Sequence, residues 1–290
     1  MNYCVEPTQK KLNDLTPKDG KSYVKGVVHP PLVNTIISKL LRDTAKNYGD
    51  REALIFPNHR LTYLDFDNKV DALAKGFLTL GLKKGDRLGI WAPNRLEWVL
   101  TQFATARIGV VLVNINPAYR LSELEYSLAS VGCSALVLAQ SSKNSNFLNM
   151  IRELVPEIDS CSKNKLCPAK LPELRHVIVM NNVENFDGLW SFEDIVELGE
   201  HASEQELCES ENNLQPKDAI NIQFTSGTTG QPKGATLSHY NIVNNARLVT
   251  ERMRLTENDR LAIPVPLYHC FGMVMGVLGA VSKGAAMVFP

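Results

Sequence analysis

The hydrophobic positions of residues 32–81 predict two amphipathic helices. Apolar residues recur at helical spacing before Gly49, which supplies a stop. They are Val33, Ile36, Ile37, Leu40, Leu41, Ala45 and Tyr48. Thr62 and Asp65 form a possible capping box at the start of the second helix, which ends at Gly81. Its apolar positions are Phe66, Val70, Leu73, Phe77 and Leu80. Each helix is therefore expected to pack one face on a core.

From Asp86 the pattern changes to short apolar runs that alternate with helical segments. Strands are predicted at 86–92, 109–115 and 135–139, and the helices between them at 95–107 and 122–130. This βαβαβ order favours a parallel sheet covered by helices on both faces, with ligands at the carboxyl ends of its strands. The predicted fold class is therefore α/β, with βαβ-type parallel sheets and covering helices. Trp91 and Trp98 are interpreted as core residues of a strand and a helix.

Two polar stretches interrupt the alternation. The chain between Gln140 and Glu173 is rich in Ser, Asn, Lys and Pro and is interpreted as a surface insertion with one amphipathic segment at 147–155. A strand is expected at 175–181, and an acidic, polar linker leads from 197 to 218 into a further apolar run.

These features predict the domain organisation. The segments are an N-terminal extension at 1–30, a first α/β subdomain at 31–200, an acidic linker at 201–217, and the start of a second α/β subdomain at 218–290. The last residues, 284–290, read as a strand that begins where the chain stops. The fold is therefore expected to be incomplete at residue 290, with exposed apolar surface there that favours self-association.

Composition limits the classes of partner. With 290 residues and 44% apolar content the chain can bury a sizeable core. Lys plus Arg and Asp plus Glu are both 31, so no overall attraction to nucleic acid or acidic membranes is expected. The apolar run from Phe271 to Val281 is far shorter than a membrane span, and the N-terminus shows neither a secretory signal nor a readable transit peptide. Any bound anion must therefore meet a local site.

The six cysteines lie at 4, 133, 161, 167, 208 and 270, without the C-x-x-C pairs of zinc sites or the density of a disulfide framework. We therefore expect reduced thiols, no metal site and an intracellular protein. Cys161 and Cys167 lie in one polar loop and could form a disulfide, although a chance spacing is the simpler interpretation.

Residues 224–234, "FTSGTTGQPKG", are the first candidate for chemistry. Backbone N–H groups freed by glycines, together with hydroxyls and one lysine, can surround phosphate oxygens. The candidate phosphate-binding residues are Thr225, Ser226, Gly227, Thr228, Thr229, Gly230, Gln231, Pro232 and Lys233. The spacing fits neither the P-loop G-x-x-x-x-G-K-[ST] nor the dinucleotide G-x-G-x-x-G pattern. Composition alone leaves a Ser/Thr/Gly hairpin turn as an equal alternative.

The longer string "FTSGTTGQPKGATLSHYNI" resembles the phosphate-binding signature of the adenylate-forming (AMP-binding) enzymes. This superfamily includes acyl-CoA synthetases, coumarate-CoA ligases, beetle luciferases and the adenylation domains of peptide synthetases. A second family motif, "PLYHCFGMVMG", occupies 266–276, and upstream segments extend the resemblance back to about Leu32. The stretches "GATLSHYNIVNN" and "NINPAYR" most resemble medium-chain fatty acyl-CoA ligases of the acyl-CoA synthetase family member 2 type.

The resemblance implies a fatty acid CoA ligase with ATP, Mg²⁺ and coenzyme A as cofactor or co-substrate. The carboxylate attacks the α-phosphorus of ATP, and the coenzyme A thiol then displaces AMP. It implies that residues 225–233 grip the β- and γ-phosphates and that His269 is catalytic, near the reacting carboxylate, whereas a lone histidine would otherwise be interpreted as structural. One face of the apolar helix at 271–281 would line the acyl tunnel. It also implies a mitochondrial location.

Other family motifs do not occur in the 290 residues. The sequence contains no aromatic-Gly-x-Thr-Glu segment for Mg²⁺ and nucleotide, no T-G-D for the ribose, and no small C-terminal domain with its lysine. We therefore expect a truncated form that is inactive or weakly active alone. Two alternatives stay open: a non-catalytic partner or regulator of a full-length enzyme, and a ligase for aromatic or other carboxylic acids.

Ser238 and His239 take structural interpretations. Ser238 precedes a helical pattern and is expected to be its N-cap. His239 follows it and is interpreted as a surface residue of the first turn.

Overall fold

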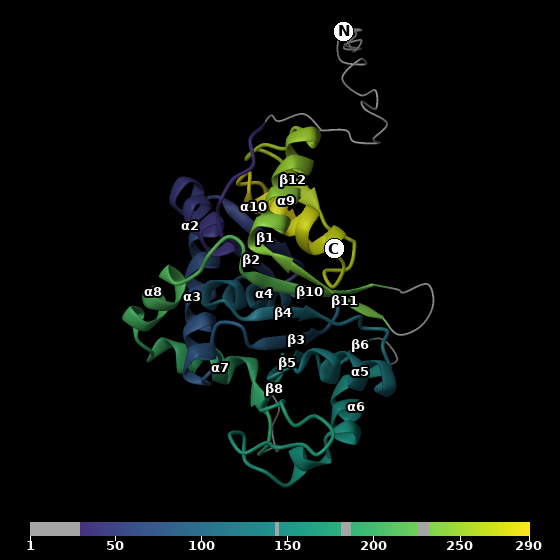
Figure 1. The fold of residues 1–290 in the computed structure, drawn as a ribbon. Helices are drawn as coiled ribbons and strands as arrows, with labels where there is room; N and C mark the ends of the chain where they lie inside the picture. The colour runs from purple at the N-terminus through teal and green to yellow at the C-terminus, as the bar shows by residue number, and fades with distance from the viewer. Residues whose placement is uncertain (1–29, 143–144, 181–186, 226–231) are drawn as a thin grey trace, which may run out of the picture. The chain divides into compact units, whose positions relative to one another are not determined.

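The computed structural model describes residues 30–142, 145–180, 187–225 and 232–290. The chain divides into two compact units, residues 1–33 and residues 34–290, and the fold below is that of the second. Among its described residues, a seven-stranded sheet and a four-stranded sheet carry the architecture, with helices packed against them (Figure 1).

The seven-stranded sheet has the order β11-β10-β4-β3-β5-β8-β9. Its strands are β3 (Arg87–Trp91), β4 (Val111–Asn114), β5 (Ala135–Leu138), β8 (His176–Val179), β9 (Trp190–Ser191), β10 (Ala219–Thr225) and β11 (Lys233–Ser238). Neighbouring strands are parallel except β10 and β11, which form an antiparallel hairpin at the edge. The predicted βαβαβ order and parallel sheet are confirmed.

The predicted helices lie close to the expected ranges. They are α2 (Ile37–Tyr48), α3 (Tyr63–Thr79), α4 (Leu96–Ile108), α5 (Leu121–Val131) and α6 (Phe147–Leu154). The capping box predicted at Thr62 is present: its side chain accepts from the Asp65 N–H, and Asp65 accepts from the Thr62 N–H. Trp91 and Trp98 are fully buried, as predicted.

The acidic stretch predicted as a linker contains a helix. Helix α7 (Phe192–Glu200) precedes it, and α8 (Glu204–Asn212) occupies much of 201–217. Leu207 anchors α8 with 1% of its surface exposed, and Glu204 pairs with Lys75 of α3 at 2.5 Å. The hydrophobic pattern missed α8 because a single buried leucine gives almost no periodicity, whereas its N-cap Ser203 and its ion pairs hold it in place.

The four-stranded sheet has the order β12-β13-β1-β2. Its strands are β1 (Glu52–Phe56), β2 (His59–Thr62), β12 (Arg260–Ala262) and β13 (Ala286–Val288). Strand β13 lies between β12 and β1, and Phe289 stacks on Phe56 with ring centroids 4.3 Å apart. The expectation of exposed apolar surface at 284–290 is wrong, because β1 and β12 cover this strand.

Both sheets therefore combine strands from either side of the predicted boundary at 201–217. Two smaller elements, the β6 (Ser141–Ser142) and β7 (Ser145–Asn146) ladder and the 3₁₀ turn η1 (Pro156–Asp159), lie in the predicted surface insertion. The division into two subdomains stays a prediction.

The last helices are α9 (His239–Met253), the π-helix η2 (Phe271–Leu278) and α10 (Gly279–Val281). Ser238 caps α9 as predicted, since its hydroxyl accepts from the Asn241 N–H. The helix expected at 271–281 is present, but it begins as a π-helix. A Cβ on Gly272 would lie 2.5 Å from the Pro266 carbonyl oxygen, so the close approach at this position requires glycine.

His239 contradicts its interpretation as a surface residue, since its side chain is 0% exposed. Its Nδ1 accepts a hydrogen bond from the Ile37 N–H at 3.2 Å, and this bond links the start of α9 to the start of α2. His239 is buried because it lies against Ile37. The sequence around residue 239 gives no sign of a contact with a residue so distant in the chain.

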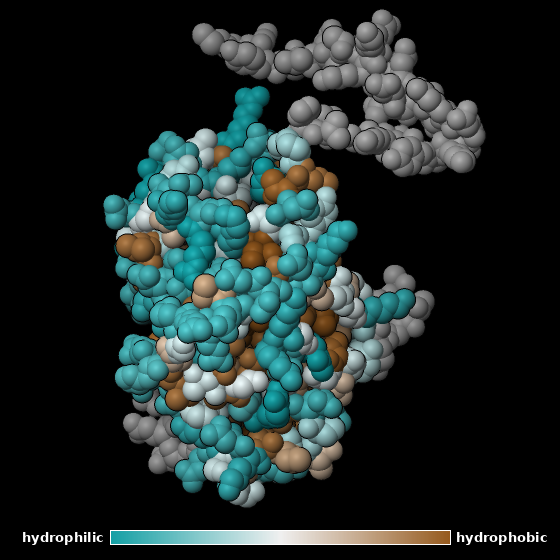
Figure 2. All heavy atoms as spheres, turned by 60° about the vertical axis from the view of Figure 1, so that its left-hand side comes forward, coloured by the Kyte–Doolittle hydropathy of each residue, from teal (hydrophilic) through white to brown (hydrophobic). Residues whose placement is uncertain are grey.

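Figure 2 shows one face of the molecule, on which hydrophobic residues form separate patches among hydrophilic ones. Large apolar side chains that are exposed include Leu64, Met253 and Phe271. Within the described residues no helix combines the length and the hydrophobicity that a membrane crossing requires.

Candidate functional site

The two ends of the candidate phosphate segment, residues 225–233, are held by the β10–β11 hairpin. Thr225 ends β10 and pairs in register with Lys233, the first residue of β11, and its hydroxyl donates to the Lys233 carbonyl at 3.4 Å. The hydroxyl of Tyr126 on α5 donates to the Pro232 carbonyl at 3.1 Å. The sheet and α5 therefore fix where the segment leaves and re-enters the fold.

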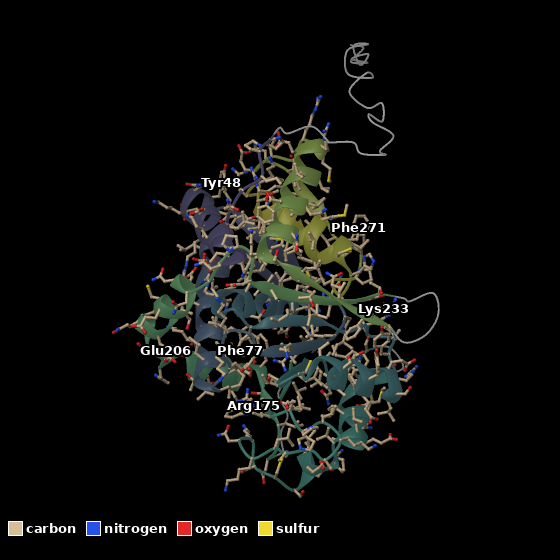
Figure 3. The ribbon with its side chains drawn as sticks, viewed as in Figure 1. Tyr48, Phe77, Arg175, Glu206, Lys233 and Phe271 are labelled. Atoms are coloured by element: carbon tan, nitrogen blue, oxygen red, sulfur yellow. The ribbon has the colours of Figure 1, made fainter. Side chains whose placement is uncertain are left out.

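The middle of the segment lies outside the described residues. This concerns Ser226, Gly227, Thr228, Thr229, Gly230 and Gln231, whose proposed roles stay predictions. Lys233 is exposed on the hairpin (Figure 3), and it makes no ion pair within the ranges that the structure describes. Its ammonium group can therefore meet an anion from solution.

His269 lies in a turn that leads into η2, within residues 265–273, which we call the histidine segment. Its side chain is exposed, and its Nδ1 accepts a hydrogen bond from the Phe271 N–H at 3.2 Å. Because Nδ1 acts as an acceptor, the proton of the neutral imidazole is carried by Nε2. The His269 carbonyl accepts from the N–H groups of Gly272 and Met273, at 3.0 and 3.1 Å. The ring thus offers an N–H donor at a fixed turn.

Two amide side chains from the seven-stranded sheet reach the histidine segment. Asn94, after the carboxyl end of β3, donates to the Val265 carbonyl at 2.9 Å and accepts from the Leu267 N–H at 2.8 Å. Asn114, the last residue of β4, donates to the Tyr268 carbonyl at 3.0 Å. The backbone on the N-terminal side of His269 is therefore tied to the sheet.

A hollow of about 860 Å³ opens at the carboxyl ends of β3 and β4, beside the histidine segment. Its lining comprises Pro93, Asn94, Asn116, Pro117, Ala118, Arg120, Ser142, Ser145, Pro264, Pro266, Tyr268 and Pro290. Arg120 is exposed and donates to the Ser145 hydroxyl at 3.1 Å. Partial burial, followed by the charges of Glu123 and Tyr268, raises the pKa of Tyr119 and keeps its phenol protonated. A cation and hydroxyls at this edge suit an anionic, phosphate-bearing ligand.

Sequence reasoning about single residues missed Asn94, Asn114, Arg120 and Tyr126. The signal for three of them was present, because residues 93–95 follow one predicted parallel strand and residues 114–120 contain and follow the carboxyl end of another, where ligands are expected. Tyr126 carried no such signal, since it lies within a helix and reaches Pro232 only through packing.

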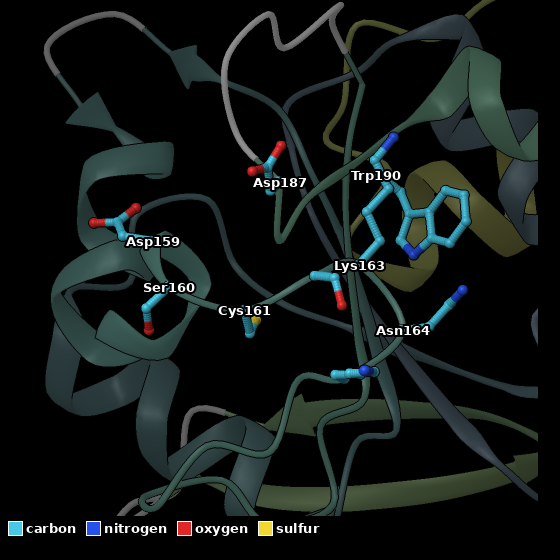
Figure 4. Close-up of a pocket in the computed structure, with 9 residues that line it drawn as sticks. Asp159, Ser160, Cys161, Lys163, Asn164, Asp187 and Trp190 are labelled. Carbon is cyan, nitrogen blue, oxygen red and sulfur yellow. The ribbon is translucent and has the colours of Figure 1, made fainter.

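A second hollow, of about 620 Å³, lies between the loop of residues 159–165 and Trp190 (Figure 4). The Lys163 ammonium is 4.9 Å from the Trp190 ring centroid and 2.6 Å from the Asp194 carboxylate. Its cation is therefore already neutralised. This hollow adjoins β9, at the opposite edge of the sheet from β10 and β11, so it does not belong to the site.

Cysteines and metal ligands give little further chemistry. Cys133, Cys161, Cys167, Cys208 and Cys270 are free thiols. Among the described residues no group of three or more His, Cys, Asp or Glu side chains is arranged to hold a metal ion. The expectation of no metal site stays a prediction.

Comparison with known proteins assigns the chain to a family. Residues 41–290 match the family model described as AMP-binding enzyme. The chain belongs to this family. The predicted resemblance to adenylate-forming enzymes is thereby confirmed.

Curated relatives of this AMP-binding chain include acyl-CoA ligases. It is 43% identical over 273 residues to the mitochondrial medium-chain acyl-CoA ligase ACSF2 of Danio rerio, covering 93% of this chain and 45% of that protein. The human ACSF2 is 42% identical over 94% of this chain and 45% of its own length. The putative acyl-CoA synthetase YngI of Bacillus subtilis is 41% identical over 89% and 47%. The chain thus spans about 45% of the length of the curated relatives it matches.

Solved structures confirm the fold. Apo MbtA of Mycobacterium smegmatis aligns with a TM-score of 0.75 and 29% identity over 89% of this chain and 44% of that one. The anthranilate CoA ligase AuaEII, at 23% identity, aligns with a TM-score of 0.73 over 90% and 46%. The N-terminal domain of FACL13 from Mycobacterium tuberculosis, at 22% identity, aligns with a TM-score of 0.69 over 88% and 57%. The predicted α/β fold of the N-terminal portion of adenylate-forming enzymes is confirmed.

Proposed function

We propose that this chain carries the phosphate-binding and carboxylate-orienting portion of an ATP-dependent acyl-CoA ligase, with a medium-chain fatty acid as substrate. The observation that carries the proposal is the pairing of two elements on one sheet. The β10–β11 hairpin presents the phosphate segment, and β3 and β4 hold the histidine segment through Asn94 and Asn114. The names of the ACSF2 relatives support the choice of a medium-chain acid.

The first step joins the acid to AMP. A carboxylate oxygen attacks the α-phosphorus of ATP, an oxygen–phosphorus bond forms, and the bond to the pyrophosphate oxygen breaks. Lys233 and the hydroxyls of the phosphate segment would counter charge on the departing pyrophosphate. The His269 Nε2–H would donate to one carboxylate oxygen and so orient the other towards phosphorus.

The second step transfers the acyl group to a thiol. The thiol of coenzyme A releases its proton to water, its sulfur attacks the acyl carbon, and the bond from that carbon to the AMP oxygen breaks, which releases AMP. We assign coenzyme A to the hollow at the ends of β3 and β4, because Arg120 offers a cation for its phosphates and Tyr268 of the histidine segment lines the same hollow. The acyl chain would lie along η2, where Met273 and Val274 are apolar and buried from water.

Mg²⁺ would arrive bound to the ATP phosphates and would partly neutralise their negative charge. None of the roles given to Lys233, His269 or Arg120 depends on a metal ion bound by this chain. A mitochondrial location follows the naming of the ACSF2 relatives and belongs to the same proposal.

The proposal predicts that Lys233 contributes to nucleotide affinity. Lys233→Ala is expected to weaken ATP binding to the 290-residue chain by about 10- to 100-fold, since one charge-assisted contact is worth roughly 1.5–3 kcal/mol. Isothermal titration calorimetry at fixed ionic strength measures the change. Lys217→Ala is the matched control, because Lys217 is an exposed cation that precedes the other end of the hairpin. Equal losses in both variants would contradict a specific phosphate contact.

We further propose that the 290 residues alone are inactive or nearly so. They contain neither the Mg²⁺-binding and ribose-binding motifs of the adenylate-forming enzymes nor the lysine of the small C-terminal domain of those enzymes. ATP-pyrophosphate exchange with octanoate on the purified chain measures this, and robust exchange would overturn it. Profiling with octanoate and benzoate in the same assay addresses the alternative of aromatic acids.

Self-association, or association with a longer copy, is the remaining proposal about partners. The exposed side chains of Met253 and Phe271, on α9 and η2, are its structural support. Sedimentation velocity over a range of concentrations, with and without the longer enzyme, would detect it. A constant monomer sedimentation coefficient would contradict it.

A further inference from the structure

The proposed function requires the phosphate segment and the histidine segment to keep a fixed separation. The first would hold ATP and the second the acid, and the reacting oxygen must meet phosphorus at close range. The two segments lie in different regions of the chain, so some structure must set their distance. The inference below rests on the proposed function and concerns the group that sets it.

Asn114 contacts both the histidine segment and β10, the strand that ends at Thr225. Its side chain is 2% exposed at the carboxyl end of β4. Its Nδ2 donates to the Tyr268 carbonyl, next to His269, at 3.0 Å and approaches the Met273 sulfur at 3.3 Å. Both contacts are to the histidine segment.

The other end of the Asn114 amide faces the phosphate strand. Its Oδ1 accepts from Nδ2 of Asn221 at 2.9 Å, and Asn221 also donates to the Leu112 carbonyl at 2.9 Å. Asn221 is fully buried in β10, which ends at Thr225, the first residue of the phosphate segment. One amide therefore connects the strand that leads into the phosphate segment with the backbone that carries His269.

The partners also fix the orientation of this amide. A flipped Asn114 would turn its oxygen towards the Tyr268 carbonyl and its NH₂ towards the NH₂ of Asn221, so both contacts would become repulsive. A leucine would fit the surrounding apolar strand without the cost of burying an amide. Asn94, which follows β3, bonds Val265 and Leu267 in the same way. Of the two amides, Asn114 contacts the residue closer in sequence to His269.

We propose that Asn114 is a positioning residue, which sets the position of His269 relative to Thr225, the last residue of β10, through Tyr268 on one side and Asn221 on the other. It acts through these residues and contacts no substrate. A ligand that touches both segments, such as an acyl-adenylate, depends on Asn114, whereas one that touches the phosphate segment alone does not.

The test compares Asn114→Leu with a matched control, Asn244→Leu. Asn244 is also buried, at 5% exposure, but its Nδ2 donates to the Tyr240 carbonyl within α9. The probes are ATP and an octanoyl sulfamoyl adenosine, a non-reacting acyl-adenylate analogue, and calorimetry measures their affinities. N114L is expected to lose about tenfold or more in affinity for the analogue and less than about twofold for ATP. N244L should change neither the affinity for the analogue nor the affinity for ATP by more than about twofold.

A ligand-free measurement separates this inference from the proposed function. The His269 imidazole resonance, assigned with an H269N variant, is expected to shift in N114L and to stay in place in N244L. An unshifted resonance in N114L, or equal changes in both variants, would overturn the role of Asn114. A wild-type chain that binds neither probe would overturn the proposed function, while the resonance still decides the positioning. Asn114→Ser, a smaller change, replaces N114L if the leucine variant does not fold.

Discussion

At the scale of single residues, burial changes the chemistry of two histidines. Burial lowers the pKa of His239 to about 4, against a smaller opposing effect of the Asp218 charge. Burial, aided by the charge of Arg175, likewise lowers the pKa of His176 to about 4. Both rings are therefore neutral in the folded protein at pH 7. Their chemistry is structural, whereas the exposed ring of His269 is free to meet a ligand.

These shifts predict a loss of stability in mild acid. An unfolded histidine takes up a proton near pH 6.5, while the folded His239 stays neutral until about pH 4, so the unfolded state binds more protons in between. The free energy of unfolding should fall as the pH drops from 6.5 to 4, by about 3 kcal/mol for each such histidine. Urea titrations at several pH values measure the slope.

His239→Asn should flatten this slope, leaving the contribution of His176. Asn244→Leu, in the same helix, removes no titrating group and is expected to lower stability equally at every pH. An unchanged slope in H239N would show that His239 is not the group responsible.

At the scale of elements, two glycines allow helices α3 and α7 to touch. A Cβ on Gly199 would lie 1.8 Å from the Ala72 carbonyl oxygen, and one on Gly76 would lie 1.9 Å from the Ile195 carbonyl oxygen. Backbone faces backbone at this crossing, so no side chain can move aside.

At this crossing we expect Gly→Ala, which usually stabilises a helix, to destabilise the protein instead. Within a helix, Gly→Ala usually stabilises by about 0.5–1 kcal/mol. Gly199→Ala should instead destabilise by about 1–3 kcal/mol, because α7 must move away from α3. Thermal and urea unfolding measure the change. Gly276→Ala is the control, since the atoms nearest to its new methyl group would be those of the Ile263 side chain, at 3.2 Å, rather than backbone. A G199A chain as stable as the wild type would refute the tight contact.

At the scale of the whole molecule, a buried ionic network joins four helices. Arg107 of α4 is 0% exposed, pairs with Asp67 at 2.5 Å and also with Asp71, both on α3. Arg42 of α2 bonds the same carboxylates, and it reaches Glu211 of α8 at 3.1 Å. The network explains how the acidic helix α8 is recruited to the core.

Removing the central cation should therefore be costly. Arg107→Met is expected to lower the free energy of unfolding by about 3–5 kcal/mol, because Asp67 and Asp71 lose a buried partner. The double variant with Asp71→Asn should lose less than the sum of the single losses. Lys39→Met, which removes an exposed pair with Asp43, should have little effect. Additive losses in the double-mutant cycle would contradict coupling between Arg107 and Asp71.

The sequence alone determined the features that depend on neighbouring residues. Alternation of apolar runs predicted β3, α4, β4 and α5, and capping chemistry predicted the starts of α3 and α9, since caps involve residues three positions apart. The family motifs marked the phosphate segment and His269 because each is a continuous string. These signals come from residues that are close together in the chain, so the sequence alone reveals them.

Only the tertiary structure decided which distant residues meet. It placed β13 between β12 and β1, buried His239 beneath Ile37, and brought the Asn114 amide between Asn221 and Tyr268. Each of these contacts joins residues far apart in the chain, where hydrophobic period and capping chemistry carry no information about partners. The sequence thus named the candidate chemical groups, whereas packing between strands and helices determined the separations at which they are held.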